Sequence, residues 1–400
     1  MKWYYNLAQA IQSALHQIFN EHKQGDKVIQ QLLKNNPKWG SRDRRYVARV
    51  MFDILRWKRL YEYLGNADIT TKEGKWIVLG VWSVLNDISL PDWDTFSTVN
   101  ADIILEKNKN LKDDKIKQSV PDWLYETGQK QLKDIWPDEL QALNQEAGVV
   151  LRVNTLKTNV NDLFEILLSQ GVDTYTDTNF PDALFLKKRQ KVTHLKAYRQ
   201  GLFEVQDASS QLVAPFTGAK AGQTVIDACA GAGGKTLHLA TQMQNGGQLL
   251  AYDIYPSKIR ELLTRARRNG VKNIIEAAVI NNRIVKKNTN KADILLLDAP
   301  CSSLGTLRRK PGLKWELNPL KLQQINVIQQ DIINRYEAML KPGGTLVYVT
   351  CSILPQENEE IVNNFLATHK NYIFVDDKTI WPSKSVGDGF YMAKLLKQTK

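Results

Sequence analysis

The sequence predicts an α/β protein, with a mostly parallel, doubly wound sheet preceded by an all-α region. From about residue 220, short apolar segments alternate with segments of helical character, which is the pattern of parallel strands joined by helical crossovers. Before about residue 118, apolar residues recur at helical spacing and glycine is scarce, which indicates a helical bundle. A chain of 400 residues is long enough for two or three domains.

Composition restricts the partner and the compartment. Lys plus Arg is 54 against 42 for Asp plus Glu, and a net charge of +12 favours nucleic acid, with a generic basic surface as the alternative. Residues 1–20 carry no export signal, and no run of about 18 apolar residues predicts a membrane span. Three cysteines are too few for a disulfide scaffold, so we expect reduced thiols in a cytoplasmic protein. We also expect a monomer with no membrane partner.

The helical region is best defined in SRDRRYVARVMFDILRWKRL, and NLAQAIQSALHQIF and GKWIVLGVWSVL show similar spacing. Its apolar residues fall at the i, i+3, i+4, i+7 and i+8 positions of one buried face: Val47, Val50, Met51, Ile54 and Leu55. The opposite face carries Arg42, Arg45, Arg49, Arg56 and Arg59. These arginines predict either contact with RNA phosphates or a solvated basic face.

The next part of the chain connects the two regions. We predict a linker or frayed helix in ILEKNKNLKDDKIKQSVPDW, and then two short helices separated by Pro137. LRVNTLK, at 151–157, alternates as a strand does. The predicted segments are therefore a helical domain at 1–118, linker helices with an N-terminal subdomain at 119–219, and the α/β domain at 220–400.

A glycine-rich turn follows the first predicted strand, TVIDACA. Ligands bind at the carboxyl ends of strands in such a sheet, and Gly231, Gly233 and Gly234 would let one approach the backbone there. A phosphate-binding P-loop is disfavoured because Cys229 stands where that motif needs its first glycine. A dinucleotide fingerprint fails at Thr236.

The second strand ends at Asp253, about 20 residues after the glycine turn. A carboxylate there can accept hydrogen bonds from a ribose, which favours an adenosine ligand such as S-adenosylmethionine. The alternative is an N-cap for a helix that starts near Pro256, and both roles can hold together.

Two cysteines follow two later strands. ADILLLD leads to Cys301, and GTLVYVT leads to Cys351. Both should reach one cleft, where a reactive role competes with simple packing; a metal site is disfavoured because no His lies near either thiol. A thiolate that adds to carbon 6 of cytosine makes carbon 5 able to accept a methyl group, and Asp298 could hydrogen-bond the ring nitrogen at position 3. Two thiols suit a reaction in which one attacks carbon 6 and the other assists the release of the product.

Three motifs, DACAGAGGKT, DAPCSSLGTLRRKPGLKW and LKPGGTLVYVTCSILPQENE, make the chain resemble the RsmB (Fmu/sun) branch of RNA cytosine-C5 methyltransferases. The resemblance extends from LRVNTLK and GLFEVQDASSQLV to DGFYMAKL, and the first helices resemble a NusB-like RNA-binding domain. It implies a Rossmann-like class I methyltransferase fold that uses S-adenosylmethionine. It also implies that Cys351 is the nucleophile and that Cys301 assists product release.

The resemblance also implies a set of cofactor-binding residues, and this chain departs from the family pattern at three of them. In the turn, Ala232 replaces a proline and Gly231 is added, which should loosen it, and Asn281 replaces an aspartate expected at the adenine ring. An amide oxygen could still accept a hydrogen bond from the adenine amino group. The full set is Cys229, Ala230, Gly231, Ala232, Gly233, Gly234, Lys235, Asp253, Asn281 and Asp298.

The predicted function is methylation of carbon 5 of a cytidine in small-subunit ribosomal RNA, without a metal. Transfer RNA as the substrate is one alternative, and a non-catalytic RNA-binding assembly factor on the same fold is another. Arg308, Arg309 and Lys310 follow the first cysteine motif and are predicted either to contact the phosphates of a flipped nucleotide or to form a solvated turn.

Overall fold

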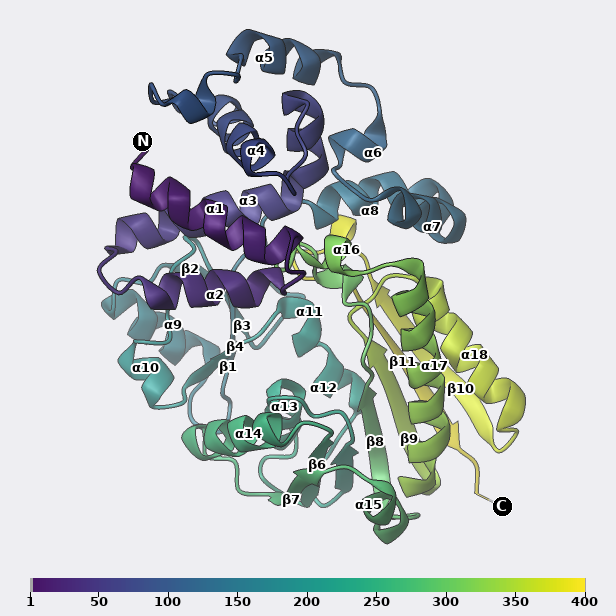
Figure 1. The fold of residues 1–400 in the computed structure, drawn as a ribbon. Coiled ribbons are helices and arrows are strands. Elements are labelled where there is room, and N and C mark those ends of the chain that lie inside the picture. The colour runs from purple at the N-terminus through teal and green to yellow at the C-terminus, as the bar shows by residue number, and fades with distance from the viewer. Residues whose placement is uncertain (1–2, 400) are drawn as a thin grey trace. The chain divides into compact units, whose positions relative to one another are not determined.

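The computed structural model describes residues 3–399, and the chain forms two compact units. The first contains Met1–Gln145 and Leu307–Pro319, and the second contains Glu146–Thr306 and Leu320–Lys400. Residues 119–145 thus group with the helices before them. The chain leaves the second unit after Thr306 and returns to it at Leu320. The ribbon can be followed in Figure 1.

Helices are the only regular secondary structure among the described residues of the first unit. Its longest helix, α3, contains the strongest predicted amphipathic segment and caps its end with Asn66 in the left-handed conformation. The helices are α1 (Tyr5–Phe19), α2 (Gly25–Asn35), α3 (Ser41–Gly65), α4 (Lys72–Leu85), α5 (Ala101–Asn110), α6 (Asp114–Lys117), α7 (Asp122–Leu132), α8 (Trp136–Leu143) and α16 (Leu313–Glu316), with short 3-10 turns at Asp94–Phe96 and Lys133–Ile135.

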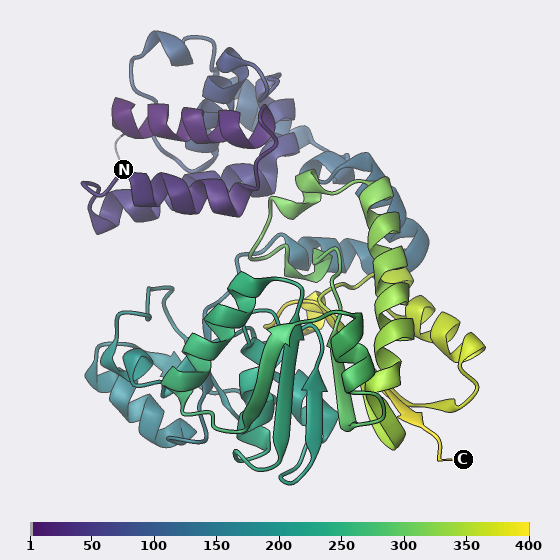
Figure 2. The same ribbon diagram turned by 60° about the horizontal axis from the view of Figure 1, so that its bottom comes forward.

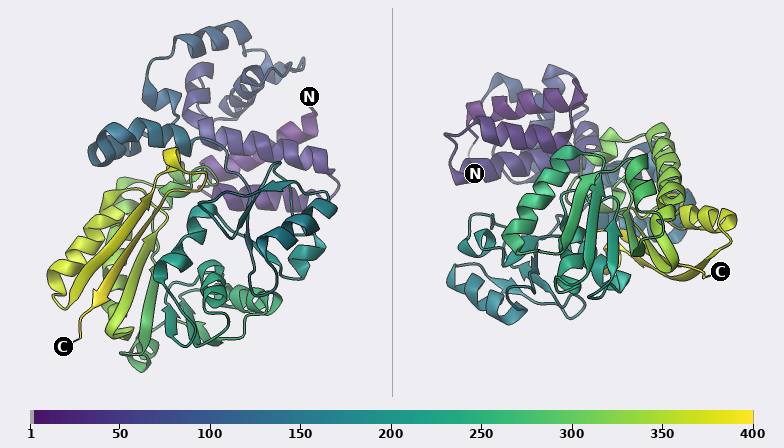
Figure 3. Two further views of the ribbon diagram at one scale, coloured as in Figure 1. Left: turned by 180° about the vertical axis from the view of Figure 1, so that it is seen from behind. Right: turned by 90° about the horizontal axis from the view of Figure 1, so that it is seen from below.

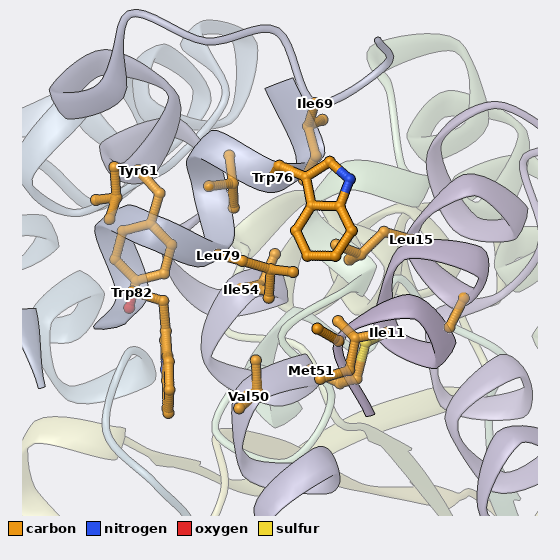
Figure 4. Packing of buried hydrophobic residues seen from close by; sticks show 14 of the residues in the cluster. Ile11, Leu15, Val50, Met51, Ile54, Tyr61, Ile69, Trp76, Leu79 and Trp82 are labelled. Carbon is orange, nitrogen blue, oxygen red and sulfur yellow. The ribbon is translucent and has the colours of Figure 1, made fainter. Parts of the chain in front are cut away.

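The core of this unit forms around the predicted apolar face of α3. All five of its predicted residues are fully buried: Val47, Val50, Met51, Ile54 and Leu55. They pack against apolar side chains of α1 and α4, such as Leu15 and Leu79 (Figure 4). Trp3, Tyr46 and Trp82 add edge-to-face aromatic contacts with centroids 5.2 to 5.8 Å apart. The bundle prediction is therefore confirmed.

Part of the predicted basic face is structural. Arg56 is buried and donates to the carbonyl oxygens of Gln145 and Arg308, both at 3.1 Å. Arg59 donates to the Val120 carbonyl at 2.7 Å. The helical period placed these arginines opposite the apolar face, but later segments of the same unit cover that side of α3.

One local prediction in this unit needs correction, and the structure decides between two alternatives for another segment. Pro137 does not separate α7 from α8; it lies in the first turn of α8, where its missing N–H costs nothing. The break falls instead at Lys133, whose backbone has a φ of 50°. The predicted linker is mostly helical, since α5 and α6 occupy it with side-chain caps at Asn100 and Asp113.

The segment 307–319 belongs to the helical unit by its contacts. Arg308 is 8% exposed and donates through Nε to the Ala142 carbonyl at 2.8 Å. Lys314 is buried and donates to Arg56 O at 2.7 Å and Asn144 Oδ1 at 3.1 Å. Arg308 is therefore not in a solvated turn, and its burial argues against a phosphate contact; Lys310 is exposed.

The second unit is built on a seven-stranded sheet of order β10-β11-β9-β8-β5-β6-β7. Strands β7, β6, β5, β8 and β9 are parallel; β11 pairs antiparallel with β9, and β10 pairs antiparallel with β11 at the edge. The predicted doubly wound, mostly parallel sheet is confirmed. The strands are β5 (Thr224–Asp227), β6 (Gln248–Asp253), β7 (Ile274–Val279), β8 (Ala292–Asp298), β9 (Leu340–Thr350), β10 (Tyr372–Ile380) and β11 (Phe390–Lys397).

Helices cover both faces of this sheet (Figures 1 and 2). On one face, Leu295 and Tyr348 pack with Ile333 of α17 and Phe365 of α18. On the other, Leu296 packs with apolar residues of α12 and α13. The helices are α12 (Val213–Thr217), α13 (Gly234–Gln242), α14 (Pro256–Asn269), α15 (Asn282–Lys287), α17 (Pro319–Tyr336) and α18 (Glu359–Thr368), with 3-10 turns at Leu304–Thr306, Glu337–Met339, Pro355–Glu357 and Pro382–Lys384.

A smaller antiparallel sheet of order β2-β3-β1-β4 precedes the large one in the chain, and the unit is seen from behind and below in Figure 3. The predicted strand in LRVNTLK ends at Val153, before the turn that Asn154 forms. The small sheet and the helices beside it in sequence are β1 (Val150–Val153), α9 (Val160–Ser169), β2 (Thr174–Tyr175), β3 (Ala183–Leu186), α10 (Lys196–Arg199), β4 (Phe203–Val205) and α11 (Ala208–Gln211). Within residues 3–399, no helix is long and apolar enough to cross a membrane.

Candidate active site

The carboxyl ends of β5, β6, β8 and β9 carry the predicted site residues. Along the chain, β6 and β7 lie on one side of β5, and β8 and β9 lie on its other side. The strand order therefore reverses between β5 and β8. A crevice for a ligand opens at such a reversal in doubly wound sheets. The glycine turn follows β5, Asp253 ends β6, Asp298 ends β8, and Cys351 follows β9.

The two predicted cysteines meet. Strands β8 and β9 are parallel with Asp298 opposite Val349, and this register brings the residues after them together. The Cys301 and Cys351 sulfur atoms lie 3.3 Å apart, and Ser303 Oγ lies 3.3 Å from Cys351 Sγ. Both thiols are partly buried.

The surroundings push the two thiol pKa values in opposite directions. The hydrogen bond from Cys301 lowers the pKa of Cys351, and Ser303 and the Lys235 charge act in the same direction, against burial and the Asp298 charge. The same sulfur contact raises the pKa of Cys301 well above its usual value, with burial adding to the shift. The pair therefore favours a thiolate at Cys351 and a protonated Cys301.

An ion pair stands beside the thiols. Lys235 Nζ lies 2.7 Å from Asp298 Oδ2, and their side chains are 11% and 29% exposed. Burial lowers the pKa of Lys235, but Asp298 outweighs it and the net shift is upward, so the ammonium stays charged. The Lys235 ammonium also lies 5.1 Å from the centre of the Phe390 ring.

The glycine turn has the backbone conformation that its sequence predicts. Gly231 and Gly233 have φ values of 51° and 88°, in the left-handed region that favours glycine. A Cβ at Gly233 would also come within 2.7 Å of Leu262, whereas one at Gly231 would meet nothing within 4 Å. Open space therefore faces the backbone at Gly231.

Two arginines donate hydrogen bonds to carbonyl oxygens of this turn. Arg265 donates to the Ala232 carbonyl at 2.7 Å, and Arg152 donates to the Gly234 carbonyl at 2.6 Å. Arg265 is itself paired with buried Glu204 at 2.9 Å. These contacts restrain the turn where proline is replaced by Ala232.

Asp253 bridges the turn and the next helix. Its Oδ2 accepts from Gly231 N at 2.9 Å and its Oδ1 accepts from Tyr255 N at 2.8 Å. The N-cap of α14 is Tyr255, which makes no side-chain capping hydrogen bond; Asp253 lies two residues before it and binds its N–H, so the predicted N-cap role of Asp253 is wrong. A carboxylate has about four acceptor sites, which leaves two for ribose hydroxyls.

Asn281 has a local role that the sequence analysis missed. Its Oδ1 accepts from Ile284 N at 3.0 Å and caps α15, for which an asparagine before a helix was the available signal. The side chain is exposed, and the second lone pair of its amide oxygen remains for an adenine amino group. Open backbone at Gly231, the Asp253 carboxylate and Asn281 together fit an adenosine ligand.

Other residues of the predicted set serve as support. Ala230 N donates to the Tyr252 carbonyl at 2.8 Å, which ties the turn to β6. Burial raises the pKa of Cys229 well above its usual value, as expected for a packed thiol. Asp227 and Thr236, which were not predicted, form a buried hydrogen bond of 2.6 Å, and burial raises the pKa of Asp227 to about 7.

Sequence reasoning also missed Ser303 and Glu357. Ser303 contacts Cys351 Sγ and has a φ of 58°, in the left-handed region, a conformation that has no sequence signal in a serine. Glu357 is fully buried beside the residues that follow both cysteines. Among residues 3–399, no group of three or more His, Cys, Asp or Glu is arranged to hold a metal ion.

Comparison with known proteins agrees with this geometry. Residues 216–396 match the family described as 16S rRNA methyltransferase RsmB/F, and residues 120–193 match the ferredoxin-like domain of RsmF/B-like methyltransferases. The probable ribosomal RNA small subunit methyltransferase B of Synechocystis sp. is 33% identical over 316 residues, which cover 73% of this chain and 71% of that protein. The chain belongs to the RsmB/F family.

A second RsmB/F relative has a similar match. Ribosomal RNA small subunit methyltransferase B of Klebsiella pneumoniae is 32% identical over 287 residues, or 70% of this chain and 66% of that protein. About a third of the length of these relatives thus lies outside the match. Membership confirms the predicted class, that of S-adenosylmethionine-dependent RNA methyltransferases.

Solved structures share the fold of this RsmB/F member. The protein PH0851 superposes with a TM-score of 0.83 at 24% identity, covering 99% of this chain and 100% of that one. A methyltransferase homolog from Pyrococcus horikoshii has a TM-score of 0.63 at 26% identity over 71% of this chain and 98% of that one. NSun6 from Pyrococcus horikoshii, solved with SFG, has a TM-score of 0.64 at 22% identity over 70% and 99%. The predicted methyltransferase fold is confirmed.

Proposed function

We propose that this RsmB/F member methylates carbon 5 of a cytidine in small-subunit ribosomal RNA through a covalent bond between Cys351 and carbon 6 of the base. One observation carries the proposal: two thiols 3.3 Å apart whose pKa values are shifted in opposite directions, at the ligand edge of a methyltransferase sheet. A thiolate is the nucleophilic form of cysteine, and Cys351 is the thiol that the site favours in that form.

In the first step, the Cys351 sulfur forms a bond with carbon 6, and the electron pair of the 5,6 double bond moves into the ring toward nitrogen 3. Asp298 is assigned to the ring edge that carries nitrogen 3. The Lys235 ammonium, 2.7 Å from Asp298, offsets the negative charge that addition places on the ring. The base must leave its stack, because the sulfur approaches its face.

S-Adenosylmethionine, when bound, supplies the methyl group that carbon 5 accepts. The turn from Cys229 to Lys235, together with Asp253, Asn281 and Asp298, is assigned to holding it. The open backbone at Gly231 and the free acceptor sites of Asp253 fit its adenosine part.

In the last step, Cys301, which has first released its own proton to solvent, removes the proton from carbon 5, the 5,6 double bond re-forms, and Cys351 leaves as a thiolate. The chief cause of the raised pKa of Cys301 is its contact with Cys351. Once Cys351 sulfur is bonded to carbon, that negative partner is gone, and the pKa of Cys301 falls toward its normal range. Adduct formation thereby prepares the base for release.

Small-subunit ribosomal RNA is proposed as the substrate because both relatives are named as ribosomal RNA small subunit methyltransferases. The helical unit, with Arg42, Arg45 and Arg49 on the outside of α3 and a chain charge of +12, is proposed to contribute to RNA binding in a cytoplasmic monomer. Bisulfite sequencing of total RNA from cells with and without the gene will identify the target; a lost signal confined to transfer RNA would overturn the ribosomal assignment.

The cysteine roles are tested with purified protein, S-adenosylmethionine and ribosomal RNA. Cys351→Ala should abolish methyl transfer while RNA binding persists. Cys301→Ala should accumulate a protein–RNA adduct, seen as a slow-migrating species on a denaturing gel, and the Cys301→Ala/Cys351→Ala double variant should form none. Methylation by Cys351→Ala would disprove this choice of nucleophile, and would leave Cys301 as the alternative.

A further inference from the structure

The two cysteine motifs share a sequence and a turn. Residues 301–304 read CSSL, and residues 351–354 read CSIL. In both, the serine hydroxyl accepts a hydrogen bond from the leucine N–H two residues later: Leu304 N to Ser302 Oγ at 3.3 Å, and Leu354 N to Ser352 Oγ at 3.2 Å. We name these the two CSxL turns. Their leucines are buried.

One carboxylate joins the two CSxL turns. Glu357, with 0% of its surface exposed, accepts from Ser302 N at 2.7 Å and from Ser302 Oγ at 2.5 Å. The Ser352 hydroxyl donates to the same Oε2 that Ser302 Oγ reaches. Gln329 Nε2 donates to Oε1 at 3.4 Å. Each serine directly follows a cysteine of the thiol pair.

The backbone around Glu357 is fixed independently of its carboxylate. Glu357 N donates to Leu354 O at 2.9 Å, and the Tyr348 hydroxyl donates to Glu357 O at 2.8 Å. The next residue, Asn358, accepts from Thr350 Oγ1 at 2.5 Å and donates to Ser352 O at 3.2 Å. Loss of the carboxylate alone therefore leaves these anchors in place.

Hydrogen-bond chemistry makes this arrangement directional. A carboxylate can only accept, so both serine hydroxyls must donate to Glu357 and turn their lone pairs toward the leucine N–H groups. Burial raises the pKa of Glu357, and hydrogen bonds from Ser302 and Ser352 oppose that shift. The charge of Glu357 is also among the causes that raise the pKa of Cys301. The carboxylate thus acts on the thiol pair by geometry and by charge.

We propose that Glu357 is a positioning residue for the methyl-transfer reaction: by holding both CSxL turns, it sets the Cys301–Cys351 contact on which proton sharing between the thiols depends. This inference rests on the proposed function. Glu357 does not touch the sulfur atoms and is assigned no chemical step. Its effect is transmitted through Ser302 and Ser352, each one bond away from a cysteine backbone.

Glu357→Gln in the full-length protein is the direct test. If the amide nitrogen takes the place of Oε1, it meets Ser302 N–H, which is also a donor; if it takes the place of Oε2, it meets both serine hydroxyls. The first orientation sets two donors against each other; the second makes both hydroxyls reverse and accept, so either one replaces charge-assisted hydrogen bonds with weaker contacts and loosens the hold on the turns. We expect kcat to fall about tenfold or more, because a small displacement of a reacting atom is costly, while KM for RNA and S-adenosylmethionine stays within about twofold.

A second measurement separates positioning from mere stability. The rate of iodoacetamide alkylation of Cys351, followed by peptide mass spectrometry as a function of pH, reports its thiolate fraction. In Glu357→Gln the midpoint should rise by about half a pH unit or more, because the hydrogen bond from Cys301 is weakened. Glu360→Gln, an exposed glutamate on α18, is the matched control and should leave kcat and the alkylation profile unchanged.

Variants of Ser302 and Ser352 keep the inference testable even if Glu357→Gln does not fold. If Glu357→Gln fails to fold, then Ser302→Ala and Ser352→Ala, which each remove one donor, should each lower kcat and raise the alkylation midpoint. If it folds, adding Glu357→Gln to Ser302→Ala/Ser352→Ala should cost far less than in the wild type, because the same link is already cut. Fully additive losses, or serine variants with wild-type kcat and alkylation profile, would overturn the inference.

Failure of this inference is distinct from failure of the proposed function. A wild-type protein that methylates cytidine, beside a folded Glu357→Gln variant with unchanged kcat and unchanged alkylation, overturns the role of Glu357 alone. A wild-type protein with neither methylation nor a trapped adduct overturns the proposed function, whereas the alkylation profiles still report on the thiol contact.

Discussion

The sulfur atoms of Cys301 and Cys351 lie 3.3 Å apart, although 50 positions separate the two residues in sequence. Parallel pairing of β8 with β9, with Leu297 opposite Tyr348 and Asp298 opposite Val349, brings them together. At this distance one thiol stabilises the thiolate of the other, so neither pKa belongs to an isolated cysteine. The Ser303 hydroxyl and the Lys235 charge add to the lowering of the Cys351 pKa, against burial and the Asp298 charge.

Removing Cys301 should make Cys351 harder to ionise. The hydrogen bond from Cys301 is the largest cause of the lowered pKa of Cys351, so Cys301→Ala should shift the pH midpoint of Cys351 alkylation upward, and Ser303→Ala should do so to a smaller extent. In the wild type, Cys229 should react slowly throughout, since burial raises its pKa. An unchanged midpoint in Cys301→Ala would contradict the proton sharing.

The same contact predicts sensitivity to a thiol oxidant. Diamide accepts two electrons and two protons and becomes a hydrazine, while the two sulfur atoms lose their protons and form a disulfide. Because their sulfur atoms are already close, Cys301 and Cys351 should pair before either pairs with Cys229. Titration should find one free thiol in place of three, with methylation lost and then restored by dithiothreitol. Cys301→Ala should show no such loss of two thiols.

The sequence predicted those candidate site residues whose positions follow from local pattern and strand order alone. The glycine turn, Asp253, Asp298 and both cysteines follow strands that read clearly, and parallel pairing brings them to one edge. Glu357 and Ser303 were missed because their roles depend on contacts with residues far along the chain and on one unusual backbone angle. The serine after each cysteine was visible, but only the structure shows that both serines reach one carboxylate.

The fold class was predicted correctly, but two details of the fold were missed for similar reasons. Strand β10 exposes most of its residues and pairs antiparallel with β11 at the edge of the sheet, and the polar second half of its sequence, YIFVDDKTI, differs from the buried strands. Arg308 and Arg56 were read as basic surface, since sequence does not reveal that 307–319 returns to the helical unit and buries both guanidinium groups there. Non-local contacts decided each of these cases.

Restoring the aspartate that the family uses in place of Asn281 should strengthen binding of the methyl donor. Asn281→Asp keeps an oxygen to cap α15 through Ile284 N, so the helix should be preserved. The new carboxylate is a stronger acceptor for an adenine amino group, and a gain of about 1 kcal/mol lowers Kd several-fold. Calorimetry with S-adenosylhomocysteine measures it. Asn282→Asp, the exposed neighbour, is the control, and equal affinities in both variants would argue against an adenine contact.

His238 should make the stability of the protein depend on pH. It is 2% exposed, and burial lowers its pKa to about 4, with the charge of Arg152 acting in the same direction against Asp182. The unfolded chain binds a proton near pH 6.5, whereas the folded protein does not until about pH 4, so stability falls as pH falls through that window. Between pH 7 and pH 5 this contribution is about 2 kcal/mol.

Urea unfolding of the wild type and His238→Gln at pH 7 and pH 5 measures this contribution. Asp227 acts in the opposite direction, since its folded pKa of about 7 makes the protein gain stability as pH falls. Asp227 is present in both proteins, so its effect cancels in their difference. The loss of unfolding free energy from pH 7 to pH 5 should therefore be smaller in His238→Gln by about 2 kcal/mol. Parallel pH profiles would show that His238 takes up its proton in the folded state.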